Sequence, residues 1–409
     1  MYTLQYIFYS IVILLIVFFI DTKFIKLHSY IPDIFFTKVS LARTVLTSLA
    51  GALLTITTFT FSTILAVLTL FASNYTPRAI ENFIDEKITM QILGIYIGGF
   101  FYCISALMFM RESSDERLVI AGTIAIIYSI VCIIYFVIFV QKVLHSMQGV
   151  NLIANIYDET VPVIEKEIYD RANTKEYSYE KGRYDMDIYA DDFGYLTVID
   201  TDALEYYLED KDGILKINSR IGDYLVKDMP IALLSLDQEF EDEEEEDKFR
   251  QKIEKCFLMQ DRKAQDSDYR FGITKLVDIT LRAISPGIND PNTAIHAIIK
   301  LSILVGKLAS VDFYHILKAQ GKNCEIYYTS YKLKEDLYNT FHQILHYAKE
   351  DVSVMHSILR GLYTIHTMAT DKNKVVVKEF ADYVYDIINE NFSSALDMEY
   401  LNEAYNEIK

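Results

Sequence analysis

Residues 41–78 read LARTVLTSLAGALLTITTFTFSTILAVLTLFASNYTPR and form the longest apolar run of the chain. A helix rises ~1.5 Å per residue, so this run is long enough to cross the ~30 Å hydrocarbon core of a bilayer. It is also too apolar for a helix on the surface of a water-soluble protein. We therefore predict a transmembrane helix here, and the rest of the chain is interpreted around it.

Small and hydroxyl side chains recur at every third or fourth position of this run, so they share one face of the predicted helix. This hydroxyl row consists of Thr44, Ser48, Gly51, Thr55, Thr58, Ser62, Thr69 and Ser73. The opposite face carries Leu46, Leu53 and Phe61, which suit contact with lipid. Two interpretations of the row are open: it packs against another helix, or it lines a wet pore or cavity. No charged side chain lies deep in the row, which argues against a proton relay.

Three further apolar runs, at 4–20, 91–110 and 119–140, complete a predicted domain of four transmembrane helices over residues 1–150. The first run lacks the basic start and small-residue cleavage site of a signal peptide, so we expect it to be retained. Between the second and third runs, Thr76, Pro77 and Arg78 indicate a helix restart that would couple the membrane domain to the rest of the protein. A short amphipathic helix at the membrane interface is expected to follow.

Charge is divided unevenly along the chain. Residues 1–150 hold nine Lys or Arg and eight Asp or Glu, and residues 151–409 hold the remaining 30 basic and 49 acidic residues. This pattern indicates a membrane region followed by an acidic soluble region, and it argues against nucleic acid as a partner. The four cysteines are scattered without metal-ligand spacing, so we expect reduced thiols, no disulfide, no metal site and no cofactor.

The soluble region is predicted to contain four parts. Residues 151–192 form a helical extension and linker, and short β-prone runs over 193–236 indicate a small β-barrel or sandwich. Residues 237–247 are almost all acidic and are expected to form a solvated loop, since they lack the ligand spacing of an EF-hand. Residues 248–409 are predicted to be helical. The expected helices there lie at 248–259, 270–284, 291–309, 326–349, 352–368 and 372–392.

A sharp corner is predicted between the second and third of these helices. Ser285, Pro286 and Gly287 stop the first helix, because Pro cannot continue it and Gly allows positive φ. Asn289 follows, and Asp290 then caps a new helix that has Pro at its first position. Asp278 and Arg282 lie on one face of the preceding helix, where they can form ion pairs with Lys275.

The elements QD, FGI, KLVDI, RA and SPGINDP within residues 262–294, together with SNYTPR at 73–78, resemble a family of uncharacterised bacterial membrane proteins. The resemblance covers most of residues 40–310. It implies four N-terminal spans, a soluble C-terminal region and a location in the bacterial cytoplasmic membrane, but no established activity. Members commonly begin with basic residues, which implies a cytoplasmic N-terminus, whereas this chain begins MYTLQY and departs from that pattern.

Two features of the sequence give opposite predictions for the side of the membrane on which the soluble region lies. Lys and Arg in the 21–43 connection favour placing that connection in the cytoplasm and the soluble region outside. A large region with few cysteines and no paired thiols fits the cytoplasm better, and we expect the soluble region there.

The corner also offers polar side chains for chemistry. Carboxylates of Asp266, Asp268, Asp278 and Asp290 and the guanidinium of Arg282 can bind an ion or small ligand, or the corner is structural. Catalysis is disfavoured, because no nucleophile–base pair and no glycine-rich phosphate loop is evident. His342 and His346 are one turn apart but lack a third ligand, so no metal site is predicted.

These observations favour a homo-oligomeric channel or channel-like transport protein, held in the lipid bilayer, with a soluble regulatory or assembly domain. The hydroxyl row would border the pore, and an ion or small molecule would bias open and closed states. A membrane-anchored sensor or interaction protein without transport is the alternative. An enzyme acting on lipid or nucleotide is a third hypothesis, for which Asp278 and Arg282 are the candidate residues.

Overall fold

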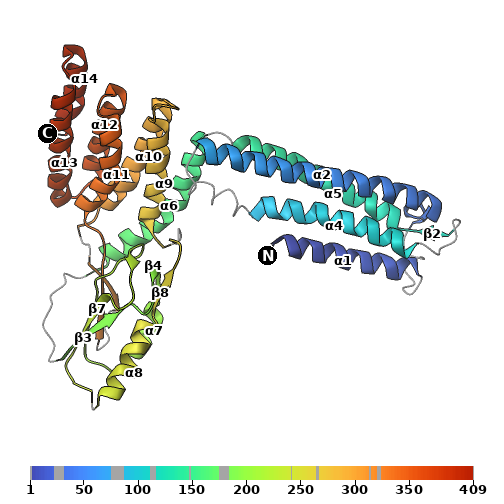
Figure 1. Ribbon diagram of the computed structural model, residues 1–409, viewed down its shortest axis with the longest axis horizontal. Helices are drawn as coiled ribbons and strands as arrows, with labels where there is room; N and C mark the ends of the chain where they lie inside the picture. Colours follow the sequence, from blue (N-terminus) through green and yellow to red (C-terminus); the bar gives the residue numbers. More distant parts are fainter. Residues whose placement is uncertain are drawn as a thin grey trace. The chain divides into compact units, whose positions relative to one another are not determined.

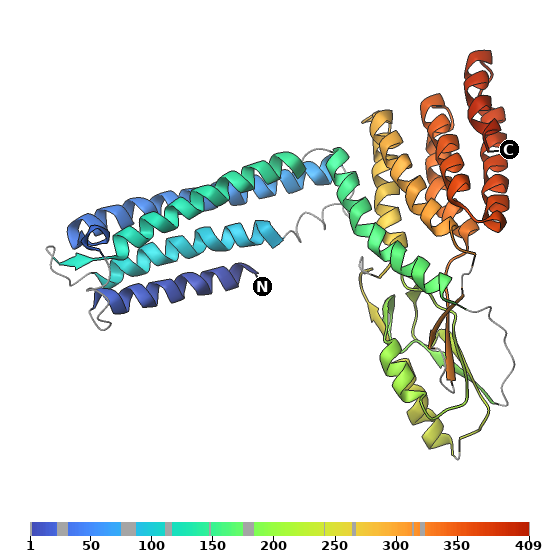
Figure 2. The ribbon, with the colours of Figure 1, turned by 180° about the vertical axis from the view of Figure 1, so that it is seen from behind.

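The computed structural model divides the chain into two compact units, residues 1–151 and 152–409 (Figures 1 and 2). Each unit is described by itself. The structure describes residues 2–22, 32–74, 87–110, 117–146, 149–174, 184–240, 242–263, 267–312, 315–319 and 324–408. Thr76, Pro77, Arg78 and nearly all of the expected interfacial helix lie outside these residues, as does Asp266.

The first unit is built from long apolar helices. They are α1 (Tyr2–Asp21), α2 (Val39–Asn74), α4 (Lys87–Phe109) and α5 (Ala121–Ser146). Helix α4 packs against α1, α2 and α5, and α2 also packs against α5. A short antiparallel pair, β1 (Thr37–Lys38) with β2 (Leu118–Val119), precedes α2 and α5, and the 3-10 turn η2 (Asp33–Phe35) precedes β1.

Glycines allow α4 to approach its neighbours closely. A Cβ atom on Gly94 would lie 2.8 Å from the Thr3 carbonyl oxygen of α1, and one on Gly99 would lie 2.7 Å from the Tyr128 ring of α5. The Gly94–Gly98 spacing in the sequence predicts close helix contact, and both glycines face α1. Small residues thus set the helix spacing in this unit.

Helices long and apolar enough to cross a membrane are α1, α2, α4, α5 and α10 (Pro291–Ala309), within the described residues. Helix α10 lies in the second unit, where Ala294, Ile298 and Leu301 are fully buried among neighbouring helices. Length and composition therefore do not distinguish a span from a core helix here. Two parts of the sequence prediction are confirmed: an N-terminal region of apolar helices, and a region of mixed helix and sheet that follows it.

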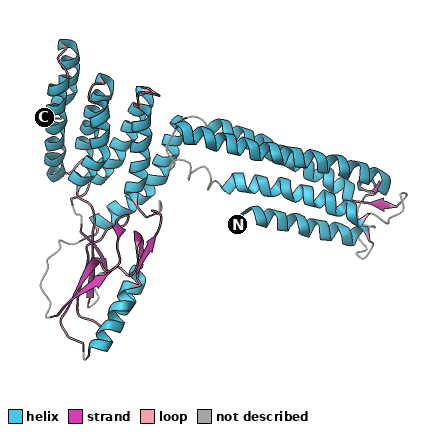
Figure 3. Cartoon of the chain, viewed as in Figure 1, coloured by secondary structure: helices cyan, strands magenta, loops and turns pink. Residues whose placement is uncertain are grey.

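The second unit contains helix α6 (Gly149–Ala172) from Leu152 onward and continues into two sheets (Figure 3). The larger sheet has the order β3 (Tyr184–Tyr189), β7 (Pro230–Leu236), β5 (Gly213–Ile217), β10 (Cys324–Thr329) and β9 (His315–Ala319). Strands β5 and β10 are parallel, with Ile326 opposite Leu215, and the other pairs are antiparallel.

The smaller sheet has the order β6 (Tyr224–Leu225), β4 (Gly194–Ile199) and β8 (Phe257–Gln260). Its strands pair antiparallel throughout. Ile188, Leu196 and Leu215 from the two sheets share one core with Leu204 of helix α7 (Thr201–Tyr207). The described strands do not close into a barrel, so the barrel alternative of the prediction over 193–236 is wrong. The strands that extend these sheets lie on both sides of that range, with β3 before it and β8, β9 and β10 after it.

The acidic stretch is only partly a loop. Helix α8 (Glu243–Glu254) starts inside it, with Asp242 as its N-cap accepting a 2.7 Å hydrogen bond from the Glu245 backbone N–H. Acidic side chains in a first turn are stabilised by the helix dipole, which offsets their mutual repulsion. The expected helix at 326–349 is also wrong at its start. Residues 324–329, CEIYYT, form the buried strand β10 instead.

The C-terminal helices pack on one another around a common core. They are α9 (Tyr269–Ala283), α10, α11 (Leu333–Ala348), α12 (Val352–Met368), α13 (Asp371–Asn391) and α14 (Ala395–Asn406). Helix α12 contacts α10, α13 and α14, and α11 contacts α9 and α13. Helix α6 packs against α9 at Gly272, where an added Cβ would collide with the Thr160 hydroxyl. This contact places α6 between the helices and the sheets of the second unit (Figure 1).

Candidate functional site

The hydroxyl row faces outward from the first unit. Every described member of it, from Thr44 to Thr69, is exposed; the side chain of Ser73 is not described. The expected lipid face is covered in part: Leu46 and Leu53 are buried against the neighbouring helices, whereas Phe61 is 51% exposed. The expectation is therefore wrong for Leu46 and Leu53, whose large apolar side chains fill the space between helices.

The threonines of the row satisfy their own hydroxyl groups. Thr55 donates to the Gly51 carbonyl and Thr58 to the Leu54 carbonyl, both at 2.9 Å, and Thr44 and Thr69 make the same bond one turn back. Such bonds use the second lone pair of a helix carbonyl and need no partner from another helix. The row is therefore compatible with lipid, with another protein copy or with water.

Interhelical polar contacts occur inside the first unit. The Tyr128 hydroxyl donates to the Ile95 carbonyl at 2.8 Å and shares a 2.8 Å hydrogen bond with Ser10. Tyr102 donates to the Ala121 carbonyl at 3.0 Å. Three further side-chain oxygens, those of Thr60, Tyr96 and Ser129, are buried without a hydrogen-bond partner among the described residues. Helix α2 therefore carries a polar side chain on its buried face as well, at Thr60.

The sequence corner is a tight structural turn. Helix α9 ends at Ala283, and the backbone N–H of Asp290 donates to the Ala283 carbonyl at 2.8 Å. Asp290 caps α10 by accepting from the Thr293 backbone N–H and hydroxyl. The residue with positive φ is Asn289, at 50°, whereas Gly287 does not adopt that conformation. The role assigned to Gly287 in the sequence is therefore carried by Asn289, a residue type that tolerates it.

A buried ionic cluster lies elsewhere in the second unit. Arg171 of α6 donates to Glu167 at 2.9 Å and to the Ser330 hydroxyl at 2.8 Å, and its side chain is 3% exposed. The Tyr269 hydroxyl of α9 donates to Asp336 of α11 at 3.1 Å and accepts from Arg171 at 3.3 Å. The cluster ties α6, α9, α11 and the end of β10 together.

Asp336 is the centre of negative charge in this cluster. It is fully buried and accepts a 2.7 Å hydrogen bond from Arg270 Nε. Burial raises the pKa of the Asp336 carboxyl, and the positive charges of Arg270 and Arg171 oppose that rise. A buried carboxylate with two guanidinium partners is stable only while both partners remain.

Tyr331 lies under two guanidinium groups at the start of α11. The Arg270 guanidinium carbon is 3.2 Å from the centre of the Tyr331 ring, and that of Arg220 is 4.4 Å away. The Tyr331 hydroxyl donates to Asp223 at 3.0 Å, and Arg220 pairs with Glu335 at 3.0 Å. Cation–π contacts of this kind hold a ring in one orientation.

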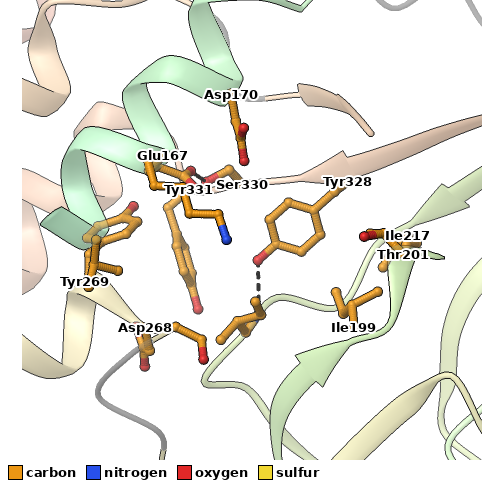
Figure 4. A pocket seen from close by; sticks show the side chains of 14 residues that line it. Glu167, Asp170, Ile199, Thr201, Ile217, Asp268, Tyr269, Tyr328, Ser330 and Tyr331 are labelled. Carbon is orange, nitrogen blue, oxygen red and sulfur yellow. Dashed lines mark hydrogen bonds between the residues drawn. The ribbon is translucent and has the colours of Figure 1, made fainter. Parts of the chain in front are cut away.

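A cavity of about 210 Å³ opens beside this cluster (Figure 4). Its lining comes from α6, the ends of β4, β5 and β10, and the residues before α9. In Figure 4, Glu167 and Asp170 lie on one side of the space and Asp268 on the other, with the Tyr328 ring beside it. All of these lining residues belong to the second unit.

Asp268 is held at the cavity by its role as the N-cap of α9. Its Oδ1 accepts from the Arg270 backbone N–H at 2.9 Å, and its Oδ2 has no hydrogen bond among the described residues, with Lys263 Nζ at 3.6 Å. Burial raises the pKa of this carboxyl above its usual 3.8, and Lys263 opposes the rise. Gly222, with φ of 92°, leaves room for the carboxylate, since a Cβ there would overlap Oδ2.

The residues singled out in the sequence divide between these places. Of the candidate carboxylates described, Asp268 reaches the cavity, and Asp278, Arg282, Asn289 and Asp290 are absent from its lining. Lys275, expected on an ion-paired face with Asp278, is buried over the Phe271 ring at 4.7 Å. Sequence reasoning did not find Glu167, Arg171, Tyr331 or Asp336. The helical spacing of Glu167 and Arg171 was the one available signal.

No group of three or more His, Cys, Asp or Glu side chains is placed to hold a metal ion within the described ranges. His342 stacks on Tyr338 with ring centres 4.6 Å apart, and His346 packs on Tyr347. The described cysteines are buried, and burial raises the pKa of Cys256 to about 11 and that of Cys324 to about 12.

Several long apolar helices, followed by a unit of mixed helix and sheet with a polar cavity, are the features of a membrane protein. The chain belongs to the family described as "Predicted membrane protein (DUF2254)", whose model matches residues 1–364. The family relation inferred from the sequence is thereby confirmed.

Relatives of the chain occur in mycobacteria. The chain is 24% identical over 279 residues to "Uncharacterized protein Rv1290c" of Mycobacterium tuberculosis H37Rv, and equally to "Uncharacterized protein Mb1321c" of Mycobacterium bovis. The match covers 66% of this chain and 53% of each relative, so the chain spans about half the length of the relatives it matches. No solved structure matches the chain.

Proposed function

We propose that this protein is a homo-oligomeric, channel-like protein of the bacterial cytoplasmic membrane whose second unit, in the cytoplasm, regulates it. The observation that carries the proposal is the exposure of the hydroxyl row on α2, from Thr44 to Thr69, in a single copy of the chain. Small residues gain little from lipid but allow close approach of another helix. The row is thus suited to meet the same row in further copies.

An oligomer built on this face would bring several rows around one axis. The threonine hydroxyls already bond to their own helix, and their oxygens keep acceptor capacity for a passing hydrated ion. The helices α1, α2, α4 and α5 pack among themselves and leave the hydroxyl row exposed, so the proposal assigns the pore to the interface between copies.

The test combines assembly and flux. T55L/T58L fills the row with larger apolar side chains. A fall in ion flux in proteoliposomes while the oligomer measured by mass photometry persists supports a pore, whereas loss of the oligomer supports packing. I130L/I133L on the exposed face of α5 is the volume-conserving control and should leave both unchanged. The channel proposal would be ruled out if the wild-type protein were monomeric in nanodiscs or if T55L/T58L conducted ions normally.

A membrane-anchored sensor without transport is the second candidate. The cavity of the second unit favours it, because Val163, Lys166, Glu167 and Asp170 of α6 form one wall. Helix α6 begins three residues after α5 ends, so a ligand that moves α6 acts on the segment that follows the membrane unit in the chain. A ligand-dependent movement of α6 in a protein that conducts no ions would favour the sensor.

A further inference from the structure

The apolar helices of the first unit are level with one another at one end. The Asp21 carboxylate at the end of α1 accepts a 2.8 Å hydrogen bond from the Ile120 N–H, just before α5. Arg43, near the start of α2, donates to the carbonyl of Met110, just after α4, at 2.6 Å. The strands β1 and β2 pair just before α2 and α5. These contacts fix the four helix ends at one level, from which the lengths of the helices can be compared.

At the other end, α2 and α5 run past α1 and α4 (Figures 1 and 2). Helix α1 starts level with the start of α4, since the Thr3 hydroxyl donates to the Met90 carbonyl at 3.0 Å. Leu53 of α2 lies beside Gly99 of α4. From this level α4 has 12 residues left to its start, whereas α2 has 21 left to its end at Asn74. At ~1.5 Å per residue, α2 therefore extends about 14 Å past α4.

The apolar lengths of the helices differ in the same way. The apolar spans of α1 and α4 comprise 19 and 21 residues, whereas those of α5 and α2 comprise 24 and 32. At ~1.5 Å per residue, α1 and α4 match the ~30 Å hydrocarbon core of a bilayer, and α2 exceeds it by about 18 Å. The excess is apolar on its surface too, because Leu65 and Leu70 of α2 and Leu144 of α5 are 49%, 37% and 61% exposed.

Neither a tilt nor a proline kink removes this excess. Fitting the apolar length of α2 into ~30 Å requires a tilt of about 50°, beyond the ~40° limit of the tilts observed for membrane helices. Helices α1 and α4 lie alongside α2 and just match the core, so at that tilt they would no longer cross it. Helix α2 is continuous over Val39–Asn74 and contains no proline. A bilayer that is locally thicker along α2 and α5 accommodates the excess instead.

We propose that the exposed face of the long pair, α2 with α5, binds phospholipids with long acyl chains. Long chains cover Leu65, Leu70 and Leu144 with hydrocarbon, whereas short chains leave these side chains among the headgroups. The side formed by α1 and α4 fits an ordinary bilayer. The protein therefore favours thick membrane, and thinning of the bilayer acts on α2 and α5 first. This inference requires that the first unit spans a membrane, and it holds whether or not ions pass through the protein.

The experiment measures which lipids the protein keeps around it. The full chain is reconstituted in vesicles with equal amounts of di-14:1 and di-22:1 phosphatidylcholine and extracted with a styrene–maleic acid copolymer. Mass spectrometry gives the lipid ratio of particles that carry the protein, relative to protein-free particles. We expect the di-22:1 lipid to be enriched about twofold or more. Equal amounts, which a face covered by further copies also predicts, or enrichment of the short-chain lipid would overturn the proposal.

Two double variants locate the surface that selects the lipid. L65N/L70N makes the extension of α2 polar, so the enrichment should fall towards equal amounts. I130L/I133L changes exposed side chains of α5 without loss of apolar surface, and its enrichment should equal that of the wild type. Full enrichment in L65N/L70N would contradict the extension of α2 as the selecting surface.

Thermal stability gives a second measurement that needs no variant. In nanodiscs of di-14:1, di-18:1 and di-22:1 phosphatidylcholine, the midpoint of helix loss followed by circular dichroism should rise by several degrees from the shortest to the longest chain. The same rise should be seen in I130L/I133L. A wild-type midpoint that stays constant or falls with chain length would overturn the proposal, even if L65N/L70N failed to fold.

Discussion

Thr58 of α2 and Arg171 of α6 are both polar residues in helices, but their hydrogen bonds differ in reach. Thr58 bonds to a carbonyl one turn back in the same helix. Arg171 bonds to Ser330, which is 159 residues away in the chain, and to Tyr269 on a third element. A hydroxyl can be satisfied locally, whereas a guanidinium with five donors requires partners from several elements.

This difference separates the two units. In the first unit the exposed polar face costs little folding free energy, since the helix itself supplies the acceptors. In the second unit each buried charge depends on the correct assembly of α6, α9, α11 and β10. Substitutions should therefore be tolerated on the hydroxyl row and poorly tolerated in the ionic cluster.

The largest effect is expected for D336A. Removing this carboxylate leaves the part-buried Arg270 without its ion-pair partner, while Arg171 keeps Glu167, and the free energy of unfolding should fall by about 3–5 kcal/mol. D371A removes a carboxylate that is 98% exposed and should change the unfolding free energy little. Chemical denaturation followed by tyrosine fluorescence measures both variants. A loss below that of D371A would show that the cluster is not cooperative.

The second effect tests the room made for Asp268. G222A places a Cβ against the carboxylate at a φ of 92°, so we expect a loss of about 1–3 kcal/mol in unfolding free energy. G287A is the matched control, because a Cβ there meets no atom within 4 Å and the backbone is not left-handed. It should be neutral or slightly stabilising in the same denaturation experiment. Equal losses of unfolding free energy in G222A and G287A would show that Gly222 does not pack closely against the Asp268 carboxylate.

The third prediction compares local with interhelical bonds in the first unit. Y128F removes hydrogen bonds to Ser10 and Ile95, and it should cost about 1 kcal/mol in unfolding from mixed micelles. T55V removes a hydroxyl bonded within α2 and should cost less than about 0.5 kcal/mol. If T55V proved the more costly variant, the hydroxyl row would already be packed against another surface.

The smallest effect concerns pH. Hydrogen bonds from the Lys332 backbone and from Arg220 outweigh the opposing effect of burial and hold the pKa of Glu335 below its usual 4.5. A lowered pKa in the folded state stabilises the protein above pH 4.5, and this contribution is lost as the pH falls through the folded pKa. E335Q should therefore be slightly less stable than wild type at pH 7, by less than about 0.5 kcal/mol because the side chain is 39% exposed. The two thermal melts should converge below that pKa.

Several features of the fold followed from local sequence signals. The Asp290–Pro291 pair marked the start of α10, and apolar runs marked α1, α4 and α5. The sequence predicted a helix at β10 because its short apolar run fits a helix and a strand equally well. The run forms a strand because it pairs in parallel with residues 213–217, which are more than 100 positions earlier in the chain. The cavity could not be foreseen, since its lining extends from Val163 to Tyr331.

The sequence by itself determined which segments are apolar enough for a membrane, where the helices of the corner end and begin, and that the second unit is acidic. These properties depend on residues within a few turns of one another, so composition and spacing report them directly. Only the tertiary structure decided which face of α2 is covered, how the strands of the two sheets pair and which carboxylate reaches the cavity. Those outcomes depend on contacts between residues far apart in the chain, such as Tyr184 with Leu236 and Gly213 with Cys324, and no local pattern encodes them.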